Sequence, residues 1–185
     1  MKTVDSRLSI PKFDSSDCIK AADEWGFNCG PAAIAAVCGL TLSQLRPLLG
    51  DFETKGYTNP TLMWQILRNL EAQFTVDFAP FKRDRVAWPK YGLARVQWEG
   101  PWTQPGVPVR ARYRHTHWVG AMLVEGDVEH MIFDVNCMAA VGGWVGESEW
   151  VSSVVPHIIK YCVPRANGTW HLTHTVEIIR PQRTF

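Results

Sequence analysis

Apolar residues in the first part of the chain recur with the spacing of helices. Residues 30–37 are almost entirely apolar and rich in alanine, which predicts a helix that Gly39 ends in the left-handed conformation glycine favours. A second helix is expected to open at Thr41 or Ser43, since both residue types are good N-caps. Apolar positions at helical spacing over 62–70 predict a third, amphipathic helix.

After these helices the pattern changes to strands. Residues 73–78 alternate between polar and β-favouring side chains, which predicts the first strand. The clearest pattern is a hairpin, with strands at 117–124 and 128–136 joined by a turn at 125–127. Residues 169–179 alternate well enough to form a closing strand.

Other stretches carry weaker patterns. Residues 1–22 mix polar residues with little periodicity and predict an irregular lead-in with a short strand at 8–10. A polar loop is expected at 51–57, and 80–114, rich in proline, is the least regular part of the chain. Residues 147–160 predict one or two helices, because a proline inside the stretch starts or kinks a second one.

Length and composition fit one domain. The chain has 185 residues, of which 46% are hydrophobic, enough to bury most of its apolar surface. The element order predicts an α+β fold over 1–185, with a helical lobe at 1–72 and a mainly antiparallel β lobe at 73–185. The net charge of +1 does not point to a nucleic acid or a membrane surface as partner.

The cysteines indicate a reducing compartment. Their number, five, is odd and no two are spaced as CxxC, which disfavours a disulfide framework or a thiolate zinc site. Residues 1–11 contain no apolar run, so they do not read as a signal peptide, and no segment approaches the length of a membrane span. We therefore predict a cytoplasmic protein with no membrane contact.

One cysteine stands where a nucleophile would be expected. Cys29 lies between Asn28 and Gly30 at the mouth of the first predicted helix. Backbone N–H groups in a first helical turn lack intrahelical partners and the helix dipole is positive there, which favours a thiolate and a developing oxyanion. The alternative is that Cys29 is a small buried core residue, as we expect for Cys38 and Cys162.

The predicted hairpin supplies a candidate base and orienter for this thiol. His117 heads the first strand and Asp134 lies toward the end of the second, so the turn geometry makes them close to cross-strand neighbours. An imidazole beside a carboxylate is what a Cys-His-Asp triad requires. Asn136 is an alternative orienter on the same strand face. Each residue alone has a structural reading, since a lone histidine on a strand is more often structural.

These segments together resemble the papain-like cysteine peptidases. The Cys-Gly-Pro-Ala helix start at Cys29, the helix-ending Gly39-Leu40-Thr41 and the His-Trp-Val at His117 occur in the order of that superfamily, over about residues 23–136. The closest form is that of the bacteriocin double-glycine leader peptidases, and phytochelatin synthases are similar around the cysteine.

The resemblance implies roles for these residues. Cys29 would be the nucleophile, His117 the general base and acid and Asp134 the orienter, acting on a peptide, isopeptide or side-chain amide through a thioester and without a cofactor. The family places a Gln donor for the oxyanion at the position of Asp23, and an ionised carboxylate cannot donate; Asn28 is the substitute we expect. Three residues are expected to line the substrate groove. They are Trp25, Trp118 and Gly30.

Other readings remain open. Loss of the Gln favours a papain-like domain without catalysis that binds a protein or nucleic-acid partner. Residues 80–114 hold eight Lys or Arg against two acidic residues, together with aromatic side chains, as in segments that line an acidic substrate or a nucleic acid. A metal site would have to draw on distant residues, and we rank it below the triad. Its possible ligands are His115, His117, His171, His174 and Cys137. A partner-binding face on the 62–70 helix ranks lowest, because its apolar stripe suits core packing.

Overall fold

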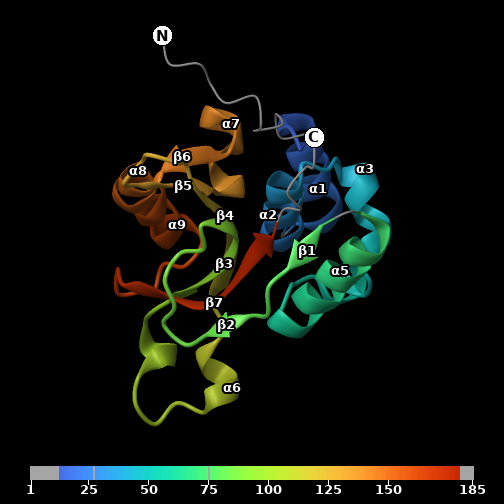
Figure 1. The fold of residues 1–185 in the computed structure, drawn as a ribbon. Helices are drawn as coiled ribbons and strands as arrows, with labels where there is room; N and C mark the ends of the chain where they lie inside the picture. Colours follow the sequence, from blue (N-terminus) through green and yellow to red (C-terminus); the bar gives the residue numbers. More distant parts are fainter. Residues whose placement is uncertain (1–12, 27, 75, 180–185) are drawn as a thin grey trace.

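The computed structural model describes residues 13–26, 28–74 and 76–179, and it has an α+β fold of helices packed on an antiparallel sheet (Figure 1). The strand expected at 8–10 lies outside the described residues. The helices are α1 (Ser15–Trp25), α2 (Cys29–Cys38), α3 (Leu42–Leu45), α4 (Phe52–Lys55), α5 (Pro60–Gln73), α6 (Val109–Arg112), α7 (Met138–Val141), α8 (Glu147–Glu149) and α9 (Val155–Tyr161). The strands are β1 (Asp77–Phe78), β2 (Lys82–Arg83), β3 (Tyr91–Trp98), β4 (Thr116–Leu123), β5 (His130–Phe133), β6 (Trp144–Gly146) and β7 (Trp170–Ile179).

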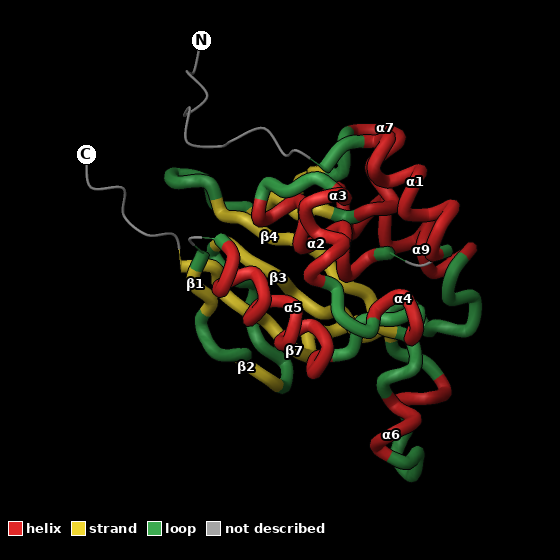
Figure 2. Tube along the Cα trace, turned by 90° about the vertical axis from the view of Figure 1, so that its right-hand side faces the viewer, coloured by secondary structure: helices red, strands yellow, loops and turns green. Residues whose placement is uncertain are grey.

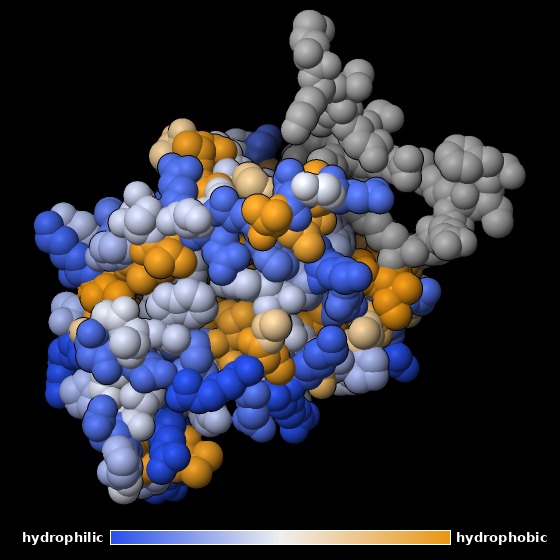
Figure 3. Space-filling model, turned by 60° about the vertical axis from the view of Figure 1, so that its left-hand side comes forward, coloured by the Kyte–Doolittle hydropathy of each residue, from blue (hydrophilic) through white to orange (hydrophobic). Residues whose placement is uncertain are grey.

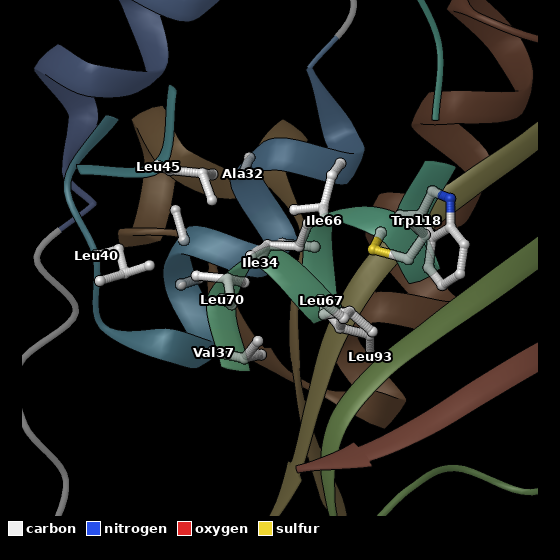
Figure 4. Close-up of a cluster of buried hydrophobic side chains, with 14 of the residues drawn as sticks. Ala32, Ile34, Val37, Leu40, Leu45, Ile66, Leu67, Leu70, Leu93 and Trp118 are labelled. Atoms are coloured by element: carbon white, nitrogen blue, oxygen red, sulfur yellow. The ribbon is translucent and has the colours of Figure 1, made fainter. Parts of the chain in front are cut away.

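Helix α2 is the centre of the helical part. Every residue from 30 to 37 is buried, and Gly39 ends the helix with φ of 65°, as the sequence predicted. Helix α5 places its apolar stripe against α2 and one face of the sheet, and Figure 4 shows Ile66, Leu67 and Leu70 meeting Ile34 and Leu93 there. The predicted helices over 30–37 and 62–70 are thus confirmed.

Two helices replace segments predicted to be irregular. Asp14 caps α1, because its carboxylate accepts hydrogen bonds from the N–H groups of Ser16 and Asp17. The lead-in predicted for 1–22 is therefore wrong from Ser15 onward. The loop expected at 51–57 contains the short helix α4, whose Phe52 is buried in the core.

The sheet is antiparallel throughout, with the strand order β1-β7-β3-β4-β5-β6 and with β2 paired to β7. Strand β3 lies between β4 and β7, although the sequence predicted irregular structure over 80–114. Both faces of β3 are covered, so it lacks polar alternation, and Arg95 and Gln97 interrupt its apolar run. The expectation for 80–114 is wrong over 91–98.

The predicted hairpin is confirmed with a shorter second strand. Gly120 pairs with Phe133, and β5 ends there, so Val135–Cys137 is a 3-10 turn instead of the strand end expected at 136. Helix α5 likewise runs to Gln73, and the strand expected over 73–78 reduces to β1.

The two faces of the sheet carry separate cores. Figure 2 shows α2, α3 and α5 lying across the sheet, and on the other face α9 and the π-helical turn Trp150–Val154 cover Ala94, Val96 and Trp98. Pro156 lies in the first turn of α9, as the prediction of a second short helix required.

The surface is mixed. Figure 3 shows apolar side chains in separate patches among hydrophilic ones. Helix α6 stands on an extension away from the sheet (Figure 1). Within the described ranges, no helix has the length and apolar character needed to cross a membrane.

Gly92 controls how closely β3 and β7 approach. A Cβ at Gly92 would lie 2.0 Å from the carbonyl oxygen of Val176, a backbone atom that cannot move aside alone. We expect Gly92→Ala to destabilise the fold by about 1–3 kcal/mol, as overpacking does, and to lower the melting temperature by about 2–12 °C. Thermal unfolding followed by circular dichroism measures this, and an unchanged midpoint would contradict the close packing of the two strands.

Candidate active site

A cleft of about 840 Å³ opens beside the N-terminal end of α2. Cys29 and Gly30 line one side, His117 and Trp118 of β4 another, and the loop containing Thr58 a third. The volume lies within the usual range of small-ligand sites. Six predicted site residues thus line one cleft: Asn28, Cys29, Gly30, His117, Trp118 and Asn136.

Cys29 is the first residue of α2. Its sulfur receives hydrogen bonds from the His117 side chain and the Trp118 backbone N–H. Burial disfavours the thiolate, but the charge and hydrogen bond of His117 outweigh it, so the pKa of Cys29 is lowered. This thiol is prepared for ionisation.

His117 lies between the thiol and a carboxylate. Its Nε2 is 2.9 Å from Oδ2 of Asp134, an ion-pair distance, although the N–H is not in line with that oxygen. Burial favours the neutral ring, but Asp134 and Cys29 outweigh it and raise the pKa of His117 well above its ordinary value. The Trp98 ring stacks on the imidazole at 6.4 Å.

Asp134 is completely buried, and both of its carboxylate oxygens accept hydrogen bonds. Oδ1 accepts from the backbone N–H and the side-chain amide of Asn136, at 2.9 and 2.8 Å, and Oδ2 accepts from Nε1 of Trp150 at 2.9 Å. Burial alone would raise the pKa of Asp134, but His117 and these hydrogen bonds lower it. Asn136 therefore donates to the carboxylate, and the described contact with the imidazole is made by Asp134, so Asn136 is not needed as the alternative orienter.

The backbone register brings His117 and Asp134 together less directly than the turn predicted. His117 pairs with Val96 of β3, and Asp134 follows the last residue of β5. The carboxylate reaches the ring because Asp134 caps the 3-10 turn after β5. The proximity predicted from the hairpin is found, with the contact made by side chains.

The two residues proposed for the oxyanion differ in position. Asp23 is exposed on α1 and does not line the cleft, so its proposed place in the oxyanion hole is wrong. Asn28 is buried and lines the cleft, and its amide donates weakly to the Cys18 carbonyl at 3.5 Å, leaving a second N–H. The sequence missed Thr58, whose buried Oγ1 has no partner in the described part of the chain and packs over Gly30.

Only two of the three residues predicted to line the groove do so. Gly30 and Trp118 line the cleft, and Trp118 Nε1 donates to the Thr58 carbonyl at 2.8 Å. Trp25 does not line the cleft, and its ring packs against Phe52, so the assignment of Trp25 to the groove is wrong.

The remaining cysteines differ from Cys29. Burial raises the pKa of Cys18, and burial together with Asp134 and Glu149 raises the pKa of Cys137 to about 12. Cys162 is exposed at the cleft.

The possible metal ligands are apart. His115 packs on Trp102 and His171 pairs with Glu99 at 2.7 Å. Across residues 13–26, 28–74 and 76–179, no three His, Cys, Asp or Glu side chains gather as metal ligands would.

The basic residues of 80–114 do not all line the cleft. Arg83, Arg95 and Arg114 line the cleft, whereas Arg110 is exposed on α6. Nucleic-acid binding by this segment stays a prediction.

Comparison of the chain with protein-family models, curated proteins and solved structures finds no match. Any functional assignment therefore depends on the geometry of the cleft.

Sequence reasoning did not identify Trp150, Trp98 or Arg95. Trp150 is bonded to Asp134 and stacks on Trp98 at 6.2 Å. The sequence signals were the number of Trp residues, nine, and the basic, aromatic character of 80–114, which contains Trp98 and Arg95, but neither says which side chain reaches the site. Their roles come from packing between distant segments.

Proposed function

We propose that this protein is a papain-like cysteine hydrolase that cleaves a peptide, isopeptide or side-chain amide. The observation that carries the proposal is the continuous chain from Cys29 through His117 to Asp134 at the edge of a cleft. A nucleophile, a base and a residue that orients the base are the three parts that acyl transfer by a thiol needs.

The chemistry follows from the charges. The Cys29 thiolate attacks the carbonyl carbon, and the imidazolium of His117 then gives its proton to the departing amine. This leaves a thioester on Cys29 and a neutral imidazole. His117 takes a proton from water as the water attacks, which releases the acid and restores the thiolate–imidazolium pair. Asp134 stabilises the imidazolium throughout.

The oxyanion needs donors that replace the missing Gln. The backbone N–H of Cys29 lies in the first turn of α2, where it has no intrahelical partner. Asn28 and the unpartnered hydroxyl of Thr58 are the two side chains suited to the second position. Loss of such a donor costs about 10²- to 10³-fold in rate, so Thr58→Val and Asn28→Ala separate the two candidates.

Selective alkylation tests the proposal. At pH 6, iodoacetamide is expected to modify Cys29 at least about tenfold faster than the other four thiols, because the cationic His117 lowers the pKa of Cys29. Mass spectrometry of tryptic peptides over time gives the rate at each cysteine. Cys29→Ala is the matched control and should remove the fast reaction while keeping the circular dichroism spectrum.

Uniform labelling of the five thiols would contradict the proposal. A second measurement tests turnover on a mixture of peptides and side-chain amides, with products detected by mass spectrometry. Fast labelling of Cys29 without turnover, together with binding of a protein that Cys29→Ala does not weaken, would favour the alternative of a domain that binds without catalysis.

A further inference from the structure

Arg95 is a buried cation that forms no ion pair with a carboxylate of the described residues. Its side chain lies on β3 and only 5% of the residue is exposed. Nη2 donates to Oγ1 of Thr116 at 3.0 Å, and the guanidinium carbon lies 5.7 Å from the centre of the Tyr113 ring. Nε is buried with no hydrogen-bond partner, and no carboxylate in the described part of the chain forms an ion pair with Arg95.

A buried charge left in this state is costly. Charged groups inside proteins are normally paired, because the lost hydration must be replaced. Burial lowers the pKa of Arg95 to about 10, with Tyr113 and Cys29 acting in the opposite direction, so the guanidinium is still cationic near neutral pH. The buried guanidinium is therefore suited to bind an anion.

Arg95 faces the proposed reaction. It pairs across the sheet with Trp118, whose backbone N–H bonds the Cys29 sulfur, and all three residues line the same cleft. A register shift after Arg95 in its pairing with β7 is the kind of irregularity that redirects a side chain. The Cys29 thiolate is already paired with His117 and loses its charge when it is acylated, so it does not supply this anion.

The surroundings of Arg95 favour an anion as well. His174 lies opposite Arg95 on β7, and its Nδ1 is buried without a partner. Burial and the charges of Arg95 and Arg83 lower the pKa of His174 to about 4, so the ring is neutral and can donate one N–H. Arg83 and Arg114 also line the cleft, where Asp84 is the one acidic side chain among the lining residues.

We propose that Arg95 binds a carboxylate of the substrate, so that the enzyme acts on amide bonds next to an acidic side chain or a chain-terminal carboxylate. This inference rests on the function proposed above. The planar guanidinium fork matches a carboxylate in two parallel hydrogen bonds, which makes Arg95 a specificity-determining residue that contacts substrate beside the thiol.

Paired alkylating reagents test this inference without knowledge of the natural substrate. N-iodoacetylglycine carries a carboxylate, whereas N-iodoacetylglycinamide is its neutral match, and iodoacetate with iodoacetamide forms a shorter pair. For each pair, the ratio of the acid rate to the amide rate at Cys29 is measured by mass spectrometry, with the thiol of N-acetylcysteinamide in solution as reference.

In the wild-type protein the acid-to-amide ratio of at least one pair is expected to be about tenfold higher at Cys29 than at the reference thiol. Hydrogen bonds to charged groups commonly contribute a factor of this size or more. Arg95→Met should remove the preference, and because the ratio compares two reagents on one variant, it reports this loss whatever the change in the overall reactivity of Cys29. Arg95→Lys, which keeps the charge but not the fork, should retain part of it.

Arg110→Met is the matched control, because it removes the same charge from α6 outside the cleft and should leave the ratio unchanged. Equal ratios at Cys29 and the reference thiol would overturn the inference even if Arg95→Met does not fold. The result differs from failure of the proposed function, in which Cys29 reacts no faster than the other thiols with either reagent.

Discussion

Replacing His117 by alanine is expected to lower the alkylation rate of Cys29 at pH 6 by between about 10- and 300-fold. Without the imidazolium, burial is the main influence left on the thiol, and its pKa returns to the ordinary range or above. A thiol of pKa about 8.5 is about 0.3% ionised at pH 6, which sets the upper figure. A less acidic thiol gives a more nucleophilic thiolate, which sets the lower one.

The pH dependence of the alkylation rate shows in which direction His117 shifts the pKa of Cys29. In the wild-type protein the rate should already be high below the ordinary thiol pKa, since the lowered pKa of Cys29 keeps the thiolate populated there. In His117→Ala it should rise only as pH approaches or passes the ordinary value. Alkylation measured from pH 4 to 10 separates the two, and His157→Ala, on the exposed side of α9, is the control expected to match wild type. Coincident profiles for His117→Ala and wild type would mean that His117 does not ionise the thiol.

Asp134→Ala is expected to cost about 3–5 kcal/mol in the free energy of unfolding, as the loss of one partner of a buried ion pair does. The substitution leaves His117, Asn136 and Trp150 without the acceptor that now engages each of them. For a chain of this length the melting temperature should fall by about 6–20 °C.

The pH dependence of this loss follows from two pKa shifts. The lowered pKa of Asp134 contributes stability that is present above its unfolded value, about 3.9, and is lost as pH falls through the folded pKa. The raised pKa of His117 contributes stability that is full below about 6.5 and is lost as pH rises through the folded pKa. The difference between wild type and variant should therefore be largest between about pH 4 and 6.5.

Thermal unfolding at several pH values measures the Asp134→Ala effect. Asp127→Ala, in the exposed hairpin turn, is the matched loss of a carboxylate and should change the midpoint by no more than about 2 °C. Trp150→Phe keeps most of the packing and removes one donor, so a smaller loss is expected. A midpoint for Asp134→Ala equal to that of Asp127→Ala would contradict the stabilising network.

Local patterns predicted the elements that are formed by residues close together in the sequence. Three such predictions are confirmed: the apolar run of α2, the apolar stripe of α5 and the turn of the β4–β5 hairpin. Strand β3 was missed because a strand covered on both faces has no alternation, and its polar residues break the apolar run. Helix α1 was missed although Asp14 is a good N-cap.

The sequence by itself determined the three residues of the proposed triad, because Cys29 lies at a helix start and a short hairpin links His117 with Asp134. The tertiary structure alone decided what surrounds them. Trp150 reaches Asp134 from a later helical segment. Asp23 and Trp25 face away from the cleft, and Arg95 points into it from a strand the pattern did not reveal. Contacts between segments distant in sequence leave no local period, so only the folded chain shows which side chains meet Cys29.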